Sequence, residues 1–137
     1  MNDKVSLLVV SCDKYSDIWE PFFSTFHKYW NDCPYQLYLA SNYKKYEDPK
    51  VKNISYGEDK PFSTNLINIL KSVEEECVLL WFEDALFTKK VNTKRVTNLI
   101  SKAISLDLDH IKLTVDYPLY YGKKNIKFGP IPRGVKY

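Results

Sequence analysis

Two carboxylates follow directly on a run of six apolar residues. The run is Cys77 to Phe82, and Glu83 and Asp84 come immediately after it. An apolar run of this length, bounded by charge, is typical of a strand buried on both faces of a parallel sheet. Ligands of such sheets bind beyond the carboxyl ends of the strands. The pair is therefore either a solvated polar turn or an acidic site, and we favour the site.

The chemistry open to this pair is metal binding. Adjacent carboxylates supply oxygen ligands for Mg²⁺ or Mn²⁺, and the diphosphate of a nucleotide completes the coordination. A glycine-rich phosphate loop is not available, because none of the four glycines follows the first apolar run. Dinucleotide fingerprints and Walker loops need glycines there, where backbone N–H groups approach phosphate. These sites are excluded, and Glu83 and Asp84 become the candidate metal ligands.

A second polar segment follows the apolar run Val5 to Val10. Its candidate ligand-binding residues are Ser11, Cys12, Asp13 and Tyr15. If the first and fourth strands flank the point where strand order reverses, this segment faces Glu83 and Asp84 across it. A third segment, Asp59 to Asn65, either lines the same crevice or forms only a turn and a helix cap. Its candidate residues are Ser63, Thr64 and Asn65.

The sequence gives little support for nucleophilic catalysis or zinc binding. His27 lies among aromatic residues at helical spacing and His110 begins an expected strand, and neither is near a Ser or Cys of a nucleophile elbow. The three cysteines lack metal-site spacing, and we expect reduced, buried thiols. A triad and a zinc site are therefore not expected.

The elements that must position these residues follow from hydrophobic periodicity. Strands are predicted at Val5–Val10, Gln36–Ala40, Val51–Tyr56 near an edge, Cys77–Phe82, His110–Val115 and, as a short candidate, Asn125–Phe128. Helices are predicted after Ser16 or Asp17 with Pro21 in the first turn, after Ser63 as N-cap, and after Asn92 or Thr93. Their apolar stripes are Trp19, Phe22, Phe23, Phe26 and Trp30, then Leu66, Ile67, Leu70 and Val73, then Val96, Leu99, Ile100, Ala103 and Ile104. This alternation predicts an α/β sandwich of three layers with a mostly parallel central sheet.

The totals limit the class of protein. The 137 residues predict one domain with its own core, and 45% hydrophobic with 27% charged residues is an ordinary globular composition. Scattered basic residues and a net charge of +3 give no support for nucleic-acid binding. No leader and no membrane-spanning segment is visible, so we expect a cytoplasmic protein. The aromatic content of 15% favours a surface for a ligand ring, and Tyr117, Tyr120 and Tyr121 either form one or pack on the surface.

Several of these segments together resemble bacterial glycosyltransferases of GT-A type, the group associated with lipopolysaccharide and capsule sugars. The resemblance rests on residues 10–15, Trp19–Phe23, Tyr38–Asn42, Ser63–Leu66 and Leu80–Asp84. It implies a nucleotide-sugar donor, a glycan or lipid-linked glycan acceptor, and location at the inner face of the membrane. Glu83 and Asp84 take the place of the family's Asp-x-Asp metal motif, although the second acid of that motif is absent.

The resemblance leaves open whether the chain is a whole enzyme or only a part of one. Enzymes of this group are longer, and their second half carries the acceptor site, so the chain is either a glycosyltransferase or its donor-binding portion, residues 1–137. For an inverting reaction, Asp116 is the candidate base that deprotonates the acceptor. The alternative from another class is a non-catalytic α/β module that binds a ligand or a protein.

Overall fold

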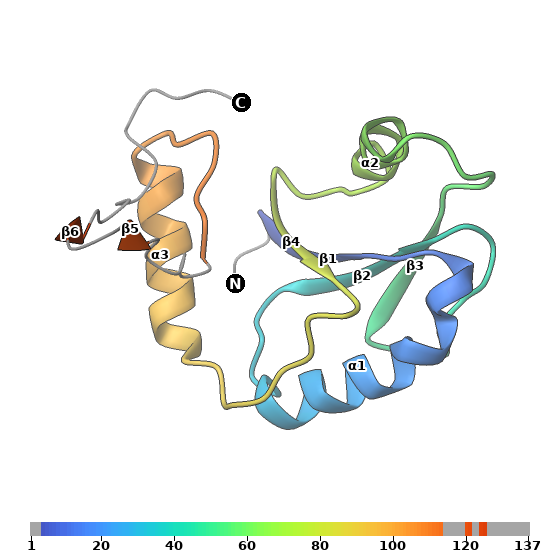
Figure 1. The fold of residues 1–137 in the computed structure, drawn as a ribbon, viewed down its shortest axis with the longest axis horizontal. Helices are drawn as coiled ribbons and strands as arrows, with labels where there is room; N and C mark the ends of the chain where they lie inside the picture. The colour runs from blue at the N-terminus through green and yellow to red at the C-terminus, as the bar shows by residue number, and fades with distance from the viewer. Residues whose placement is uncertain (1–3, 114–119, 122–123, 126–137) are drawn as a thin grey trace. The chain divides into compact units, whose positions relative to one another are not determined.

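The computed structural model describes residues 4–113, 120–121 and 124–125. The chain forms two compact units, residues 1–96 and 97–137, and each is described by itself. The first unit contains β1 (Val5–Val10), a 3-10 turn (Asp13–Tyr15), α1 (Ser16–Tyr29), β2 (Gln36–Ser41), β3 (Val51–Ser55), α2 (Phe62–Leu70) and β4 (Cys77–Phe82) (Figure 1). The helix α3 (Thr93–Ser105) crosses the boundary, and the second unit adds the antiparallel pair β5 (Tyr120–Tyr121) and β6 (Lys124–Asn125).

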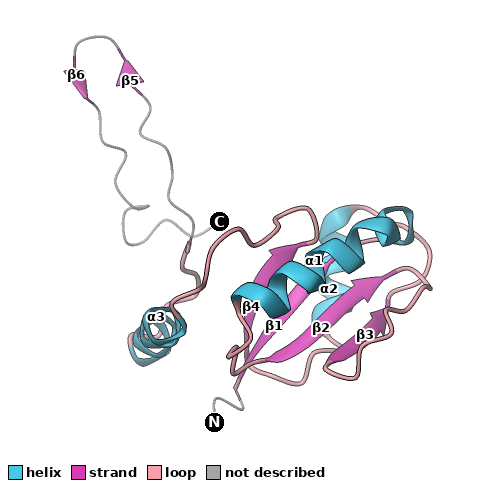
Figure 2. Cartoon of the chain, turned by 90° about the horizontal axis from the view of Figure 1, so that it is seen from below, coloured by secondary structure: helices cyan, strands magenta, loops and turns pink. Residues whose placement is uncertain are grey.

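The four strands of the first unit form one parallel sheet in the order β3-β2-β1-β4. The chain leaves β1 on one side to make β2 and β3, then returns to make β4 on the other side, so strand order reverses between β1 and β4. Figure 2 shows α1 across one face of the sheet and α2 on the other. The predictions of an α/β fold with a parallel sheet, and of the first and fourth strands flanking the reversal, are confirmed.

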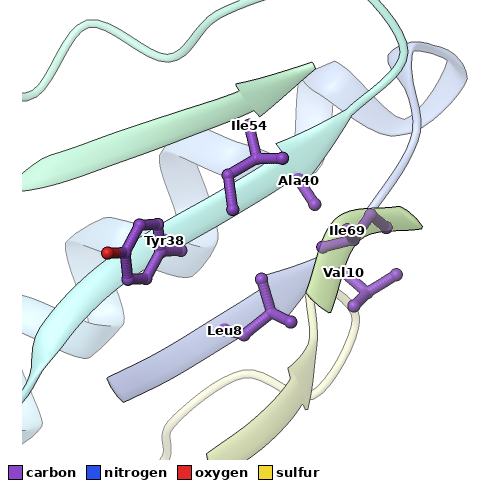
Figure 3. Packing of buried hydrophobic residues seen from close by; sticks show 6 residues of the cluster. All are labelled: Leu8, Val10, Tyr38, Ala40, Ile54 and Ile69. Carbon is purple, nitrogen blue, oxygen red and sulfur yellow. The ribbon is translucent and has the colours of Figure 1, made fainter. Parts of the chain in front are cut away.

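The two faces of the sheet have separate cores because successive residues of a strand point to opposite faces. On the α2 face, the buried cluster consists of Leu8, Val10, Tyr38, Ala40, Ile54 and Ile69 (Figure 3). On the α1 face, the aromatic residues at helical spacing are buried as predicted, namely Trp19, Phe22, Phe23, Phe26 and Trp30. Burial of this aromatic face against the sheet is what holds α1 in place.

The strand β4 is less buried than its apolar sequence predicts. Among the described strands it pairs with β1 only, and its side chains are partly exposed, with Leu80 at 41% and Phe82 at 43%. The prediction of a strand buried on both faces is wrong for the residues that the structure describes, because β4 is an end strand of their sheet. The prediction that a strand at Val51–Tyr56 lies near an edge is confirmed, since β3 (Val51–Ser55) is the other end strand of the described sheet.

Two helix starts differ from the sequence prediction. The 3-10 turn runs straight into α1, so the helix begins at Ser16 and Pro21 is its sixth residue, beyond the first turn. The helix α2 begins at Phe62 with Pro61 in the N-cap position, so Ser63 is not a cap. Neither helix has a side-chain hydrogen bond from its N-cap residue.

The apolar stripes of α2 and α3 are only partly buried. In α2 the buried residues are Asn65 and Ile69, which are one turn apart, while Ile67 and Leu70 are exposed. In α3 the side chain of Asn92 caps the helix as predicted, since the backbone N–H of Arg95 donates to Asn92 Oδ1 at 2.9 Å. Ile100 is buried there, whereas Leu99 and Ile104 are 44% and 42% exposed.

The remaining predictions concern the end of the chain and the thiols. Residues 110–113 form no strand, because the chain there makes no ladder hydrogen bonds, and residues 114–115 of that prediction lie outside the described part. Asp116 and Tyr117, and residues 126–128 of the last strand candidate, also lie outside it. The three cysteines are free and half-buried, and burial raises the pKa of Cys33 to about 11. In the described residues, no helix is both long and apolar enough to cross a membrane.

Candidate functional site

The candidate site lies at the carboxyl ends of β1, β2, β3 and β4. The register pairs Val10 with Phe82, so Ser11 and Glu83, the next residues, come side by side where strand order reverses. Parallel strands end at the same edge, which brings residues far apart in sequence together. We call this the carboxyl-edge site, and its residues are Ser11, Cys12, Asp13, Asn42, Tyr56, Asp59, Asn65, Glu83 and Asp84.

Ser11 is fully engaged in holding the site together. Its Oγ accepts a hydrogen bond from Trp19 Nε1 at 2.8 Å, and its carbonyl oxygen accepts one from the Tyr56 hydroxyl at 2.9 Å. The residue is 6% exposed. Ser11 therefore fixes the end of β1 to α1 and β3, and its role is to position the site.

Asp13 fastens the turn after β1 to the turn after β2. Its carboxylate accepts the backbone N–H of Tyr43 at 3.1 and 3.2 Å and that of Lys44 at 3.0 Å. Carboxylates that accept backbone N–H groups make short, charge-assisted hydrogen bonds. Asp13 therefore sets the shape of the β2 turn. Of the other residues predicted in this segment, Cys12 is half-buried and Tyr15 is 45% exposed.

Asn42 and Tyr56 belong to the site and were not predicted. Asn42 Oδ1 accepts the N–H of Asp13, and Asn42 Nδ2 donates to the carbonyl of Gly57, both at 2.9 Å. One amide thus joins the turns after β1, β2 and β3. The signal in the sequence was their place, since Asn42 follows directly on β2 and Tyr56 on β3.

The segment before α2 is organised by Asn65. This buried side chain donates from Nδ2 to Asp59 Oδ1 and to the carbonyl of Lys60, both at 2.8 Å. The rings of Phe62 and Phe82 lie 6.2 Å apart, which brings the first turn of α2 beside the end of β4. Ser63 and Thr64 are exposed in that turn.

The two carboxylates after β4 have different surroundings. Glu83 is 8% exposed, whereas Asp84 is exposed in a turn closed by the hydrogen bond from Ala85 N–H to the Phe82 carbonyl at 3.1 Å. Burial raises the pKa of Glu83, helped by the charge of Asp84 and opposed by hydrogen bonds from its own backbone N–H and from Ser11. Glu83 is thus the inward carboxylate and Asp84 the one that faces solvent.

Several acidic groups act on one phenol in this site. Burial raises the pKa of Tyr56 to about 12, and the charges of Cys12, Asp59, Asp13 and Glu83 add to the effect. The tyrosine therefore stays protonated at neutral pH and remains a hydrogen-bond donor. Ligands with negative charge need a counter-charge here, which is the electrostatic reason to consider a cation.

We expect Glu83→Gln to stabilise the metal-free protein at pH 7, because the neutral amide avoids the cost of burying a charged carboxylate. An acid whose pKa is raised by folding favours the folded state in its protonated form. Its contribution to stability is complete below its ordinary value of 4.5 and is lost as pH rises through the raised pKa. Urea unfolding at pH 7 and pH 4 should show a gain at pH 7 that shrinks at pH 4.

The control for this prediction is the neighbouring carboxylate. Because Asp84 is exposed, Asp84→Asn should change the free energy of unfolding little at either pH. A Glu83→Gln variant that is less stable than the parent at pH 7 would show that the ionised carboxylate contributes to the fold.

The fit of a divalent cation depends on how many ligands the protein must supply. In the part of the chain that the structure describes, no group of three or more His, Cys, Asp or Glu residues is arranged to hold a metal ion. Mg²⁺, however, is commonly held by one or two carboxylates together with substrate phosphates and water. Glu83 and Asp84 fit that second mode only, with a diphosphate as the remaining ligand.

A cavity lies at the other end of the sheet. It is open to solvent, has a volume of about 340 Å³, and is lined by Phe26, His27, Trp30, Asn31, Cys33, Tyr35, Gln36, Leu37 and Lys50. These residues surround the start of β2, whereas Glu83 and Ser11 follow the ends of their strands. The cavity is therefore separate from the carboxyl-edge site.

The structure thus brings together most of the predicted residues. Ser11, Asp13, Asn65 and Glu83 are built into the hydrogen-bonded framework, while Tyr15, Ser63, Thr64 and Asp84 are exposed around it. Comparison with known proteins found no matching family model, no matching curated protein and no matching solved structure. The function must therefore be argued from the site and from the chain itself.

Proposed function

We propose that the chain is a glycosyltransferase, or its donor-binding part, that takes a sugar from a nucleotide diphosphate to a bacterial surface glycan. The observation that carries the proposal is the position of Glu83, a buried carboxylate beside Ser11 at the reversal of strand order. Ligands of open parallel sheets bind at such a reversal. The resemblance of the sequence to GT-A enzymes supports the same assignment, together with a cytoplasmic location at the inner membrane face.

The framework of the site has a defined part in this proposal. Asp13, Asn42 and Asn65 hold the turns in one arrangement before the donor arrives, which lowers the entropy lost on binding. The exposed hydroxyls of Ser63 and Thr64 are available to the ribose or the donor sugar. Tyr15, also exposed, is available to the nucleotide.

Mg²⁺ or Mn²⁺ would be held by Asp84 and Glu83 together with the diphosphate. Bound there, a divalent cation neutralises the negative charge that develops on the departing nucleotide diphosphate. The residues of the chain do the rest by binding and orienting the donor. Asp116 stays the predicted base for an inverting reaction and lies outside the described residues.

The test is a panel of UDP-, GDP-, CDP- and dTDP-sugars, each with Mn²⁺ or with a chelator, read by thermal unfolding. A ligand present at about 100 times its Kd stabilises the folded state by about 2.7 kcal/mol. That corresponds to a rise of roughly 5–20 °C in Tm, depending on domain size. No shift with any nucleotide would contradict the proposal and favour the non-catalytic binding or interaction module.

A pair of variants tests the metal ligands within that panel. Asp84→Ala should abolish the part of the shift that requires Mn²⁺ and leave the unfolding of the ligand-free protein unchanged, because Asp84 is exposed. The control is Asp32→Ala, which also removes one exposed carboxylate, but before the start of β2. It should leave the Mn²⁺-dependent shift intact. An unchanged shift in Asp84→Ala would dismiss the metal assignment but not donor binding.

A further inference from the structure

The segment around α3 is strongly basic. Residues 85–106 contain the basic residues Lys89, Lys90, Lys94, Arg95 and Lys102 and no acidic residue. The net charge of the whole chain is only +3, and residues 117–137 also contain five basic residues and no acidic one, so the excess positive charge lies in these two segments. Basic residues gathered on one helix and the turn before it create a positive local potential, which attracts negatively charged groups.

One side of α3 combines these charges with exposed leucines. Arg95, Leu99, Lys102 and Leu106 recur at intervals of four, three and four residues, which places them on the same side of the helix. Leu99 is 44% and Leu106 49% exposed, and both basic residues are exposed. We call these four residues the α3 stripe.

The end of α3 keeps Leu106 in this position. Its N–H donates to the Lys102 carbonyl at 3.0 Å, as in a continued helix. Asp107 then adopts a left-handed conformation with φ 51°, and the N–H of Leu108 donates to the Ala103 carbonyl at 3.0 Å. This hydrogen-bond pattern is a Schellman motif, which closes a helix at a fixed residue.

The α3 stripe is distinct from the buried side of the helix. Ile100 is 7% exposed, whereas Leu99, its neighbour in sequence and about 100° away around the helix, is open to solvent. The helix thus buries one side and presents another that has both apolar and basic side chains. Exposed leucines between cations are the composition of a helix that lies in a lipid interface.

We propose that the α3 stripe binds the surface of a bilayer that contains anionic lipids. Arg95 and Lys102 pair with lipid phosphates while Leu99 and Leu106 enter the interface between head groups and acyl chains. A nucleic acid would satisfy the cations but would leave the leucines without a contact, so a bilayer fits the stripe better. The inference concerns residues outside the carboxyl-edge site and does not depend on donor binding.

The test is co-sedimentation of the full chain with vesicles of phosphatidylcholine alone or with about one third phosphatidylglycerol. We expect binding to the anionic vesicles, weak binding to the neutral ones, and a marked loss as ionic strength rises, because salt screens the charges. Arg95→Glu/Lys102→Glu should weaken binding at least tenfold, since each cation near an anionic surface contributes about fivefold. Leu99→Ser/Leu106→Ser should weaken binding severalfold without changing the charge.

Matched substitutions elsewhere serve as controls. Lys60→Glu/Lys71→Glu makes the same change of charge at exposed positions around α2, and Leu70→Ser removes a leucine that is 40% exposed. Both should bind vesicles like the parent, and circular dichroism should show that all variants are folded. The nucleotide panel on the α3 variants, without vesicles, reports separately on the carboxyl-edge site.

Three outcomes would overturn the proposal. One is equal binding to neutral and anionic vesicles, or none to either. Another is an equal loss in the control variants, which would mean that only net charge matters. The third is tighter binding to a short single-stranded oligonucleotide than to the anionic vesicles, with the leucine variant unaffected.

Discussion

Phe87→Ala is expected to lower the free energy of unfolding by about 3–5 kcal/mol, the range for removing a buried aromatic side chain. Phe87 is 6% exposed and stacks on Trp81 with ring centroids 4.7 Å apart. Its ring also makes edge-type contacts with Phe22 and Phe26, with ring centroids 5.8 and 5.4 Å apart. The substitution leaves a cavity between β4 and α1 that rigid rings cannot close.

Urea unfolding followed by circular dichroism measures this effect, and the adjacent residue supplies the control. Leu86 is 42% exposed, so Leu86→Ala should cost less than about 1 kcal/mol. Phe87→Leu should fall between the two, because it keeps part of the buried area. If Leu86→Ala and Phe87→Ala were equally harmful, the turn itself and not the aromatic contact would be responsible.

Phe87 also matters for the site because of where it lies in the chain. It follows Glu83 and Asp84 by a few residues and anchors that turn on α1. The indole of Trp81 spans the same turn, since its Nε1 donates to the carbonyl of Ala85 at 2.8 Å. A loosened turn would therefore weaken the proposed binding of a donor as well as stability.

Asn42→Ala should destabilise the protein by about 1–3 kcal/mol and weaken nucleotide-sugar binding at least tenfold. The substitution removes the acceptor of the Asp13 N–H and the donor to the Gly57 carbonyl, and leaves both part-buried groups unpaired. Because three turns are joined through this amide, their arrangement before the ligand binds is lost. Unfolding in urea and titration with the best nucleotide of the panel measure the two effects.

An asparagine on α3 provides the matched control. Asn98 is exposed, so Asn98→Ala should change neither stability nor nucleotide binding by more than a small amount. Asn42→Asp keeps the acceptor and loses the donor, and should be intermediate in stability. Unchanged binding in Asn42→Ala would show that the turns are held by Asp13 alone.

The sequence predicted the elements that have strong local patterns. Two examples are the apolar run Val5–Val10 and the aromatic stripe of α1. Both were recognised because a few neighbouring residues are enough to show a continuous apolar run or a helical spacing. The reversal of strand order between the first and fourth strands was only a conditional expectation, because the order of the elements along the chain does not determine which strands pair; the sheet confirms it. The patterns of β1 and α1 do not depend on which distant side chains meet.

Features that depend on distant partners could not be predicted in the same way. The exposure of Leu80 and Phe82 depends on β4 having a neighbour on one side only. The roles of Asn42 and Tyr56 depend on distant partners. Asn42 is 29 residues from Asp13, and Tyr56 is 45 residues from Ser11. Glu83 and Asp84 look alike in sequence, and only the packing around them buries one and exposes the other.

The pairing of β1 with β4 has a consequence for how the site is assembled. Val5 pairs with Cys77, so the contact closes a loop of 72 residues, whereas Ser6 pairs with Gln36 across only 30. Closing the longer loop costs more entropy, and non-local pairings of this kind form slowly. During synthesis β1, β2 and β3 emerge first, and Glu83 reaches Ser11 only after β4 has joined them. We therefore expect β4 to dock after β1, β2 and β3, so that ligand binding at the carboxyl-edge site would report on a late step in the folding of this sheet.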